Sequence, residues 1–149
     1  MIIREVNESD SEEIFFWRNN KVTQLMSKVS FPLNKKKHKA WFKDIIFSDN
    51  SYLFIGIHNT LKVGVVRFDC DFKKKISTVS INLNPEARGK RLSTTLLSMA
   101  IKKLLKKHQL SLRATIKKKN LISKKVFQKC GFVLEVNTKE YDYYLLNVK

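Results

Sequence analysis

Cysteine, proline and glycine are scarce in this 149-residue sequence, which contains two, two and four of them, respectively. Cys70 and Cys130 lie far apart and form no CxxC pair, which predicts reduced core thiols and excludes a disulfide framework or a zinc-binding pattern. The sequence also has no internal repeat and no Gly/Ser-rich linker that would divide it. Because a chain of this length buries one hydrophobic core, we predict a single domain over residues 1–149.

Long apolar runs are also missing. None approaches the roughly 18 residues of a membrane span, and the N-terminus runs directly into acidic sequence without the apolar core of a signal peptide. We therefore expect a cytoplasmic protein without a membrane partner.

Acidic residues are few: 13 Asp and Glu stand against 30 Lys and Arg, which gives a formal net charge of +17. Such a charge attracts phosphates, nucleic acid or other anions. A surface on which many lysines are simply solvated would give the same composition. The charge therefore favours anionic partners but does not identify one.

The hydrophobic pattern changes between strand-like alternation and helical spacing along the chain. Strands are predicted at residues 2–6, 51–59, 61–72, 73–84, 111–116, 132–136 and 141–148. Helices are predicted at residues 8–20, within 30–50 with Pro32 before it and Asn34 as its cap, along Leu92, Leu96, Ala100 and Leu104, and at 120–130 before Gly131. This order predicts an α+β domain in which a mixed, mostly antiparallel sheet of about seven strands is flanked by about four helices.

The link between residues 82 and 97, NLNPEARGKRLSTTLL, joins a half-polar strand to a helix. The first turn of a helix has unpaired N–H groups and a partial positive charge, so it binds phosphate readily. Here Arg88, Lys90 and Arg91 add charge, and Gly89 permits close approach of the main chain. Solvated basic residues at an ordinary helix start are the alternative. The spacing matches neither GxxxxGK[ST] nor GxGxxG, which argues against a P-loop or a Rossmann site.

A second segment, NLISKKVFQKCGF, follows at residues 120–132, and the two segments together resemble the GNAT superfamily of acetyl-CoA-dependent N-acetyltransferases. The family signature R/Q-x-x-G-x-G/A begins here at Arg88, although its two glycines are replaced by Arg91 and Ser93. The signature N-x-x-A/S-x-x-x-Y/F-x-x-x-G-F is matched by Asn120, Ser123, Phe127, Gly131 and Phe132. The resemblance covers nearly the whole chain and implies a GNAT-like fold, acetyl-CoA as co-substrate and no metal.

The resemblance also implies where acetyl-CoA binds. The pantetheine arm is expected to add along the main chain of Ile81, Asn82 and Leu83, where two strands diverge. The residues implied for the pyrophosphate are Arg88, Gly89, Lys90, Arg91, Leu92, Ser93 and Thr94. The residues implied for the thiol end are Asn120, Ser123 and Phe127, and the position of Asn120 also suits a helix N-cap.

Neither the general acid nor the general base has a single candidate in the sequence. Phe127 occupies the position at which many family members have the tyrosine that protonates the leaving thiolate. Tyr143, or its neighbours Tyr141 and Tyr144, is the candidate replacement, with solvent as the alternative. The candidate bases are Asp69, His38 and Glu86. Packing or substrate contact is the competing role for His38.

The segments FFWRNN, HKAW and VGVVRFD resemble the branch of the superfamily that acetylates nucleotide-linked amino sugars in nonulosonic (pseudaminic or legionaminic) acid pathways. They place Trp17, Arg18, Trp41 and Arg67 as candidate substrate-binding residues, with the core as the alternative for both tryptophans. The implied acceptor is the 4-amino group of a UDP-linked amino-dideoxy sugar. A ribosomal-protein or other protein N-terminal acetyltransferase is the alternative enzyme, and a basic nucleic-acid-binding module on the same fold is the alternative of another class. A monomer and a homodimer are both compatible with the sequence.

Overall fold

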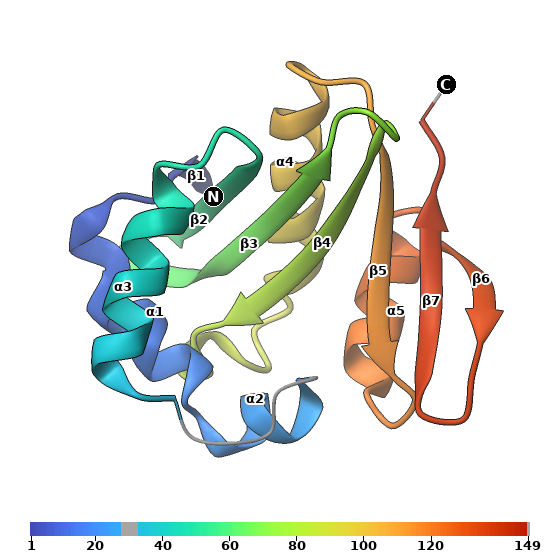
Figure 1. The fold of residues 1–149 in the computed structure, drawn as a ribbon. Coiled ribbons are helices and arrows are strands. Elements are labelled where there is room, and N and C mark those ends of the chain that lie inside the picture. Colours follow the sequence, from blue (N-terminus) through green and yellow to red (C-terminus); the bar gives the residue numbers. More distant parts are fainter. Residues whose placement is uncertain (28–32, 149) are drawn as a thin grey trace.

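The computed structural model describes residues 1–27 and 33–148, so the position of Pro32 lies outside the described residues. Seven strands form one sheet, with helices on both faces (Figure 1). The elements are β1 (Ile2–Glu5), η1 (Glu8–Asp10), α1 (Ser11–Arg18), α2 (Lys21–Met26), α3 (Lys35–Ile46), β2 (Ser51–His58), β3 (Leu61–Asp71), β4 (Ile76–Leu83), η2 (Pro85–Ala87), α4 (Ser93–Leu105), β5 (Ser111–Lys117), α5 (Leu121–Lys129), β6 (Val133–Asn137) and β7 (Tyr141–Leu146).

The strand order is β1-β2-β3-β4-β5-β7-β6, and only β4 and β5 pair in parallel. The predicted mixed, mostly antiparallel sheet is therefore confirmed. The parallel pairing joins Ile76–Thr78 to Ser111–Arg113. Beyond this short stretch β4 and β5 diverge, and the gap between their ends is visible in Figure 1.

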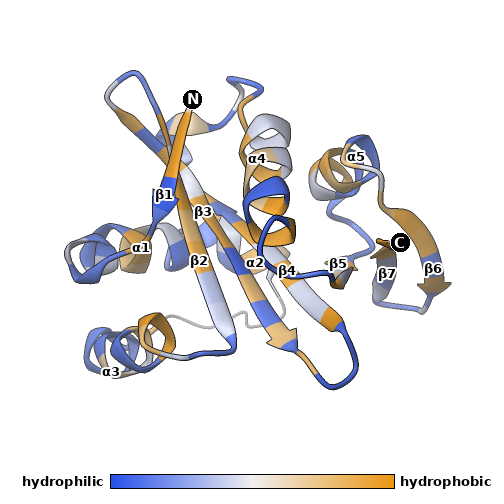
Figure 2. Ribbon diagram, turned by 90° about the horizontal axis from the view of Figure 1, so that it is seen from above, coloured by the Kyte–Doolittle hydropathy of each residue, from blue (hydrophilic) through white to orange (hydrophobic). Residues whose placement is uncertain are grey.

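The two faces of the sheet carry separate hydrophobic cores (Figure 2). On one face, α4 and α5 cover the larger cluster, to which α4 contributes the predicted stripe of Leu96, Ala100 and Leu104. On the other face, α1 and α3 cover a smaller cluster that includes Ile14 and Phe42.

Asparagine side chains begin most of the short elements. Asn20 caps α2, Asn34 caps α3 as predicted, and Asn120 caps α5. Each accepts a hydrogen bond from a first-turn N–H group that has no partner inside the helix. The prediction that Gly131 ends α5 in the left-handed region is confirmed by its φ of 95°.

Helix α2 is the element that the sequence did not indicate, and it brings the number of described α-helices to five. It is six residues long and buries no side chain, so it has no apolar stripe from which a helix can be recognised. Its cap and tertiary contacts hold it in place instead. No helix within the described residues is long and apolar enough to cross a membrane.

Candidate active site

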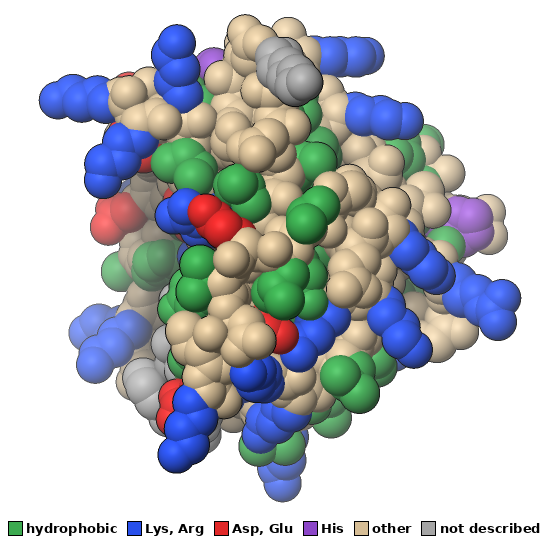
Figure 3. Space-filling model, turned by 90° about the vertical axis from the view of Figure 1, so that its right-hand side faces the viewer, with side chains coloured by type: hydrophobic (Ala, Val, Ile, Leu, Met, Phe, Trp, Pro, Cys, Tyr) green, Lys and Arg blue, Asp and Glu red, His purple; other side chains and the backbone are tan. Residues whose placement is uncertain are grey.

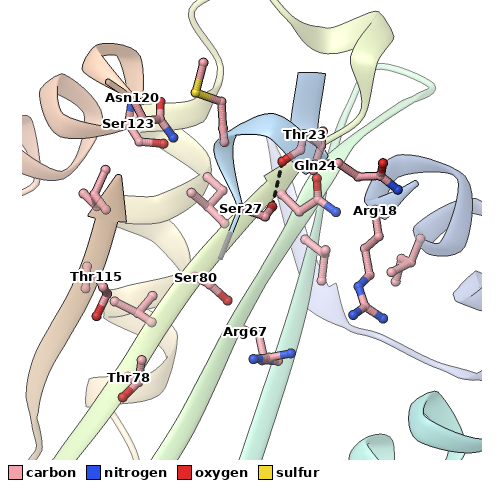
Figure 4. A pocket seen from close by; sticks show the side chains of 18 of the residues that line it. Arg18, Thr23, Gln24, Ser27, Arg67, Thr78, Ser80, Thr115, Asn120 and Ser123 are labelled. Carbon is pink, nitrogen blue, oxygen red and sulfur yellow. Dashed lines mark hydrogen bonds between the residues drawn. The ribbon is translucent and has the colours of Figure 1, made fainter. Parts of the chain in front are cut away.

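A cavity of about 400 Å³ lies where β4 and β5 diverge and extends beneath α1, α2 and α3 (Figure 4). The residues that line it are Ile14, Arg18, Thr23, Gln24, Met26, Ser27, Leu33, Trp41, Leu53, Val65, Arg67, Thr78, Val79, Ser80, Ile81, Asn82, Ala114, Thr115, Ile116, Asn120, Ser123 and Phe127. One side is therefore formed by β4, β5 and α5, and the other by the N-terminal helices and β3. We call these the strand side and the helix side.

On the strand side, the end of β4 offers an unpaired main-chain edge. Ile81, Asn82 and Leu83 pair with β3, whereas the pairing of β4 with β5 stops at Thr78. An extended chain that contains amide groups can hydrogen-bond to such an edge as an added strand would. Gly64 lies opposite Leu83, and a Cβ at this position would come within 2.6 Å of the Asn82 carbonyl oxygen.

The loop after β4 leads into a helix whose first turn has no side-chain cap. The residue at the N-cap of α4 is Leu92, so the capping bond that Asn20, Asn34 and Asn120 provide elsewhere is absent here. Gly89 and Arg91 have positive φ angles of 74° and 59°, which wind the loop around this helix end. Uncapped N–H groups beside Lys90 and Arg91 form an arrangement that suits a phosphate.

Arg88 is placed differently from the pyrophosphate role implied by the sequence. Its Nη1 donates to Asn20 Oδ1 at 3.1 Å, and its Nη2 donates to Thr23 Oγ1 at 2.7 Å. The side chain therefore ties the loop after β4 to the start of α2. This leaves the loop main chain, Lys90 and Arg91 as the groups that could bind a phosphate at the start of α4.

The α5 residues lie together at the other end of the strand side. The Asn120 side chain accepts a hydrogen bond from the Ser123 N–H at 3.2 Å, which confirms its alternative role as an N-cap, and both residues line the cavity. Phe127 is 3% exposed and packs edge-on against Phe132, so it shapes the wall and has no proton to give. The hydroxyl groups of Ser80, Thr115 and Ser123 also belong to the lining (Figure 4).

On the helix side, two guanidinium groups meet one aromatic ring. The Cζ of Arg18 lies 4.0 Å from the centroid of the Trp41 ring, and the Cζ of Arg67 lies 5.5 Å from it. All three side chains line the cavity, and their role in substrate binding stays a prediction. Burial and the neighbouring charge of Arg67 lower the pKa of Arg18 to about 10.

His38 lies behind Arg18 and outside the described lining. It is 3% exposed, with ring contacts to Phe15, Trp41 and Phe42. Its Nε2 is 3.0 Å from the carbonyl oxygen of Ser11 and its Nδ1 is 3.1 Å from Arg18 Nη1. Since a carbonyl only accepts and a guanidinium only donates, Nε2 carries the proton and Nδ1 accepts from Arg18. Burial lowers the pKa of His38 below its ordinary value of 6.5, which favours this neutral form.

The predicted cofactor residues Leu83 and 88–94 also lie outside the described lining, as do three further residues that were predicted to be catalytic or substrate-binding. Asp69 forms an ion pair with Arg67, with an oxygen 2.9 Å from Arg67 Nε, and accepts a hydrogen bond from Ser51. Trp17 is 4% exposed and belongs to the smaller core, which was its alternative role. Tyr143 on β7 lies opposite Thr115, one strand farther from β4 than the cavity.

Sequence reasoning missed the polar residues of α2 and one property of Asn82. Thr23, Gln24 and Ser27 line the cavity, and no pattern in the sequence predicted a helix there (Figure 4). Asn82 was expected to act through its main chain, but both polar atoms of its side chain are buried without a partner in the structure. Within the described residues, no group of three His, Cys, Asp or Glu side chains could hold a metal ion.

The model of the acetyltransferase (GNAT) domain matches residues 1–133 of the sequence. The chain belongs to the GNAT acetyltransferase family. This GNAT protein is an N-acetyltransferase, and its activity is the transfer of an acetyl group to an amine. The GNAT-like α+β fold expected from the sequence is confirmed.

Solved structures share this fold at low sequence identity. A variant of the spermidine N-acetyltransferase SpeG from Vibrio cholerae is 17% identical, with a TM-score of 0.84 over 99% of this chain and 95% of that one. The Vibrio cholerae spermidine N-acetyltransferase in complex with CoA and spermine is also 17% identical, with a TM-score of 0.83 over 97% and 92%. A domain from Methanocaldococcus jannaschii is 23% identical, with a TM-score of 0.81 over 99% and 97%. No curated protein matches the sequence. These relatives give no support to the resemblance with nucleotide-sugar enzymes.

The strand side fits acetyl-CoA, which supplies an activated acetyl thioester when it is bound. The free edge at Ile81–Leu83 suits the two amides of pantetheine, and the uncapped start of α4 suits the pyrophosphate. Main-chain groups carry both features, so the replacement of family glycines by Arg91 and Ser93 leaves them in place.

Proposed function

We propose that the protein transfers the acetyl group of acetyl-CoA to a primary amine of a small molecule that binds on the helix side of the cavity. One observation carries this proposal: a single cavity joins the open β4 edge to the ring of Trp41. An acceptor that rests against Trp41 therefore meets the thioester where β4 and β5 diverge. Holding the two reactants in one cavity lowers the entropic cost of their encounter.

The described lining contains no Asp, Glu or His side chain. We infer that the ammonium group of the acceptor loses its proton to water, and that the cavity then holds the neutral amine. The leaving thiolate takes its proton from solvent, and the hydroxyl groups of Ser80, Thr115 and Ser123 in the lining can donate hydrogen bonds to it, whereas Tyr143 lies outside the lining. A thiol with a pKa of about 8.5 leaves readily enough for this assistance to suffice.

Two acceptor classes compete at this point. The sequence resemblance implies a UDP-linked amino sugar, whereas two of the structural relatives are named as spermidine N-acetyltransferases. A sequence identity of 17% supports a shared fold but does not identify the acceptor. The two classes differ in the charge that they would bring to the helix side of the cavity.

Nucleic-acid binding, the function of another class, has less support. On the side of the molecule that carries β6, lysine and arginine side chains are spread around and between exposed apolar side chains and form no continuous stripe (Figure 3). Strong non-specific binding to a phosphate backbone requires many cations along one track. A steep salt dependence of binding to a DNA duplex, without any effect of coenzyme A, would favour this alternative.

The proposal is tested by measuring thiol release from acetyl-CoA with a panel of amino sugars, their UDP forms, polyamines and N-terminal peptides. Calorimetry with coenzyme A alone is the companion measurement. We expect binding of coenzyme A and turnover with at least one small-molecule amine. Turnover restricted to peptides would overturn the small-molecule proposal, and absence of coenzyme A binding at millimolar concentration would overturn the acetyltransferase site itself.

A further inference from the structure

The charge of the helix side is unbalanced. Arg18 and Arg67 both lie over the Trp41 ring, and the described cavity lining contains no carboxylate. Residues 28–32, which lie outside the description, have the sequence KVSFP and contain no Asp or Glu. Two like charges near one ring repel each other, and burial increases this cost because it reduces screening by water.

The existing partners of the two arginines leave this imbalance in place. Arg67 uses its Nε for Asp69, and both side chains of that pair are partly exposed. Arg18 forms no ion pair with any described residue, and its hydrogen bond goes to the neutral ring of His38. Its remaining N–H donors therefore have no carboxylate partner within the described part of the chain.

The contacts also fix the direction of both guanidinium groups. The Trp41 ring lies against both groups. His38 accepts a hydrogen bond from Arg18, and Asp69 accepts one from the Nε of Arg67. Arginine held in this way donates two parallel hydrogen bonds to a phosphate or a carboxylate. A polyamine would have to place a positive charge in the same space, without a carboxylate to receive it.

Given the proposed acetyltransferase function, on which this inference rests, we propose that Arg18, Arg67 and Trp41 form a subsite for an anionic group of the acceptor. The acceptor is then a small primary amine that also carries a phosphate, diphosphate or carboxylate group. A nucleotide-linked amino sugar meets this description through its diphosphate, and spermidine does not.

Binding is tested first, without turnover. The protein is saturated with coenzyme A, so that its own phosphate position is filled, and inorganic pyrophosphate is titrated while tryptophan fluorescence is followed. The sequence has two tryptophans, and Trp17 is buried in the core, so the response reports on Trp41 and should vanish in Trp41→Phe. We expect saturable binding that weakens about tenfold or more in Arg18→Gln.

Arg113→Gln is the matched control, because it removes the same charge from an arginine that pairs with Glu135 on the sheet. It should bind pyrophosphate as the unchanged protein does. Arg67→Gln is the second test variant if circular dichroism shows that Arg18→Gln is not folded. The subsite is overturned by the absence of a saturable response, by equal binding in the folded Arg18→Gln variant, or by a response to spermine in place of pyrophosphate.

Turnover is tested with acceptors that differ in one group. Phosphoethanolamine is compared with ethanolamine, and β-alanine with propylamine, to separate phosphate from carboxylate recognition. We expect KM to be about tenfold lower for the anionic member of at least one pair, and this ratio to approach one in Arg18→Gln. Preference for spermidine or for the neutral members would overturn the inference. If pyrophosphate binds but no amine is acetylated, the proposed function fails while the anion subsite stands.

Discussion

The strand side of the cavity and the loop next to it offer main-chain groups for acetyl-CoA: the open edge of β4 and the uncapped first turn of α4. The helix side offers the side chains of Arg18, Trp41 and Arg67, which come from three different elements. The strand side rests on the larger core beneath α4 and α5, and the helix side rests on the smaller one beneath α1 and α3.

Because of this difference, the two sides should tolerate different substitutions. Main-chain geometry survives many side-chain changes, which is consistent with a GNAT loop that carries Arg91 and Ser93 at the family's glycine positions. A surface of three side chains changes its chemistry when one of them changes. We therefore expect cofactor binding to respond to changes that move the backbone, and acceptor binding to respond to changes of single polar groups.

Gly64→Ala should have the largest effect, and it should fall on the strand side. The new Cβ would lie 2.6 Å from the Asn82 carbonyl oxygen and 3.0 Å from the Leu83 Cα, so β4 must move away from β3. We expect a loss of about 1–3 kcal/mol in the free energy of unfolding, measured by urea denaturation, and weaker binding of coenzyme A by calorimetry.

Gly89→Ala is the control for Gly64→Ala, because a Cβ at Gly89 meets nothing within 4 Å and only its φ of 74° opposes the change. It should cost about 1 kcal/mol. Equal losses in the two variants would show that the contact with β4 does not matter.

His38→Leu should have the next largest effect, and it should fall on the helix side. The change removes the Nδ1 acceptor of Arg18, so we expect the acceptor KM to rise about tenfold while the Kd of coenzyme A stays constant. His38→Asn keeps an acceptor on a shorter side chain and should restore part of the acceptor affinity. If His38 were the general base, kcat would collapse in both variants and KM would change little.

The sequence predicted the fold because the information for each element is local. Alternation marked the strands, the repeat of Leu96, Ala100 and Leu104 marked α4, and asparagine marked the start of α3. Helix α2 could not be found in this way. Its contacts come from Arg88, more than sixty positions along the chain, and no local apolar pattern records such a contact.

The segments expected to hold acetyl-CoA could be named from the sequence for the same reason, since each is continuous and lies next to a strand or a helix. The helix side was only partly predictable. The sequence grouped Arg18, Trp41 and Arg67 as candidate substrate contacts, and all three line the cavity. It did not distinguish the residues that line the cavity from those that support them. The sequence left a functional and a packing role open for both His38 and Trp17, and a catalytic role for Asp69. Their burial and pairing show that they lie behind the lining or in the core.

The pH dependence of stability should show a smaller effect from the same histidine. The pKa of His38 is lowered in the folded protein, chiefly by burial, so the unfolded chain binds more protons between the folded and unfolded pKa values. The contribution of neutral His38 is therefore fully present above about pH 6.5 and declines as the pH falls below it. Urea denaturation from pH 8 to pH 5 should show this decline, and His38→Asn should lack it. A slope that persists in His38→Asn would assign it to other groups.

Arg91→Gly should have the smallest effect. It tests whether the Arg91 side chain contributes charge to coenzyme A binding or crowds the phosphates. Arg91 already has the left-handed conformation that a family glycine would take, with a φ of 59°, so glycine supplies no new main-chain shape. The relief of strain, about 1 kcal/mol, is largely offset by the greater freedom of glycine in the unfolded chain.

The remaining effect of Arg91→Gly on binding is the loss of one positive charge. We expect coenzyme A to bind a few-fold more weakly, as in Lys90→Ala, with the free energy of unfolding nearly unchanged. Tighter binding in Arg91→Gly alone would mean that the side chain crowds the phosphates, and that main-chain geometry by itself is sufficient to hold them.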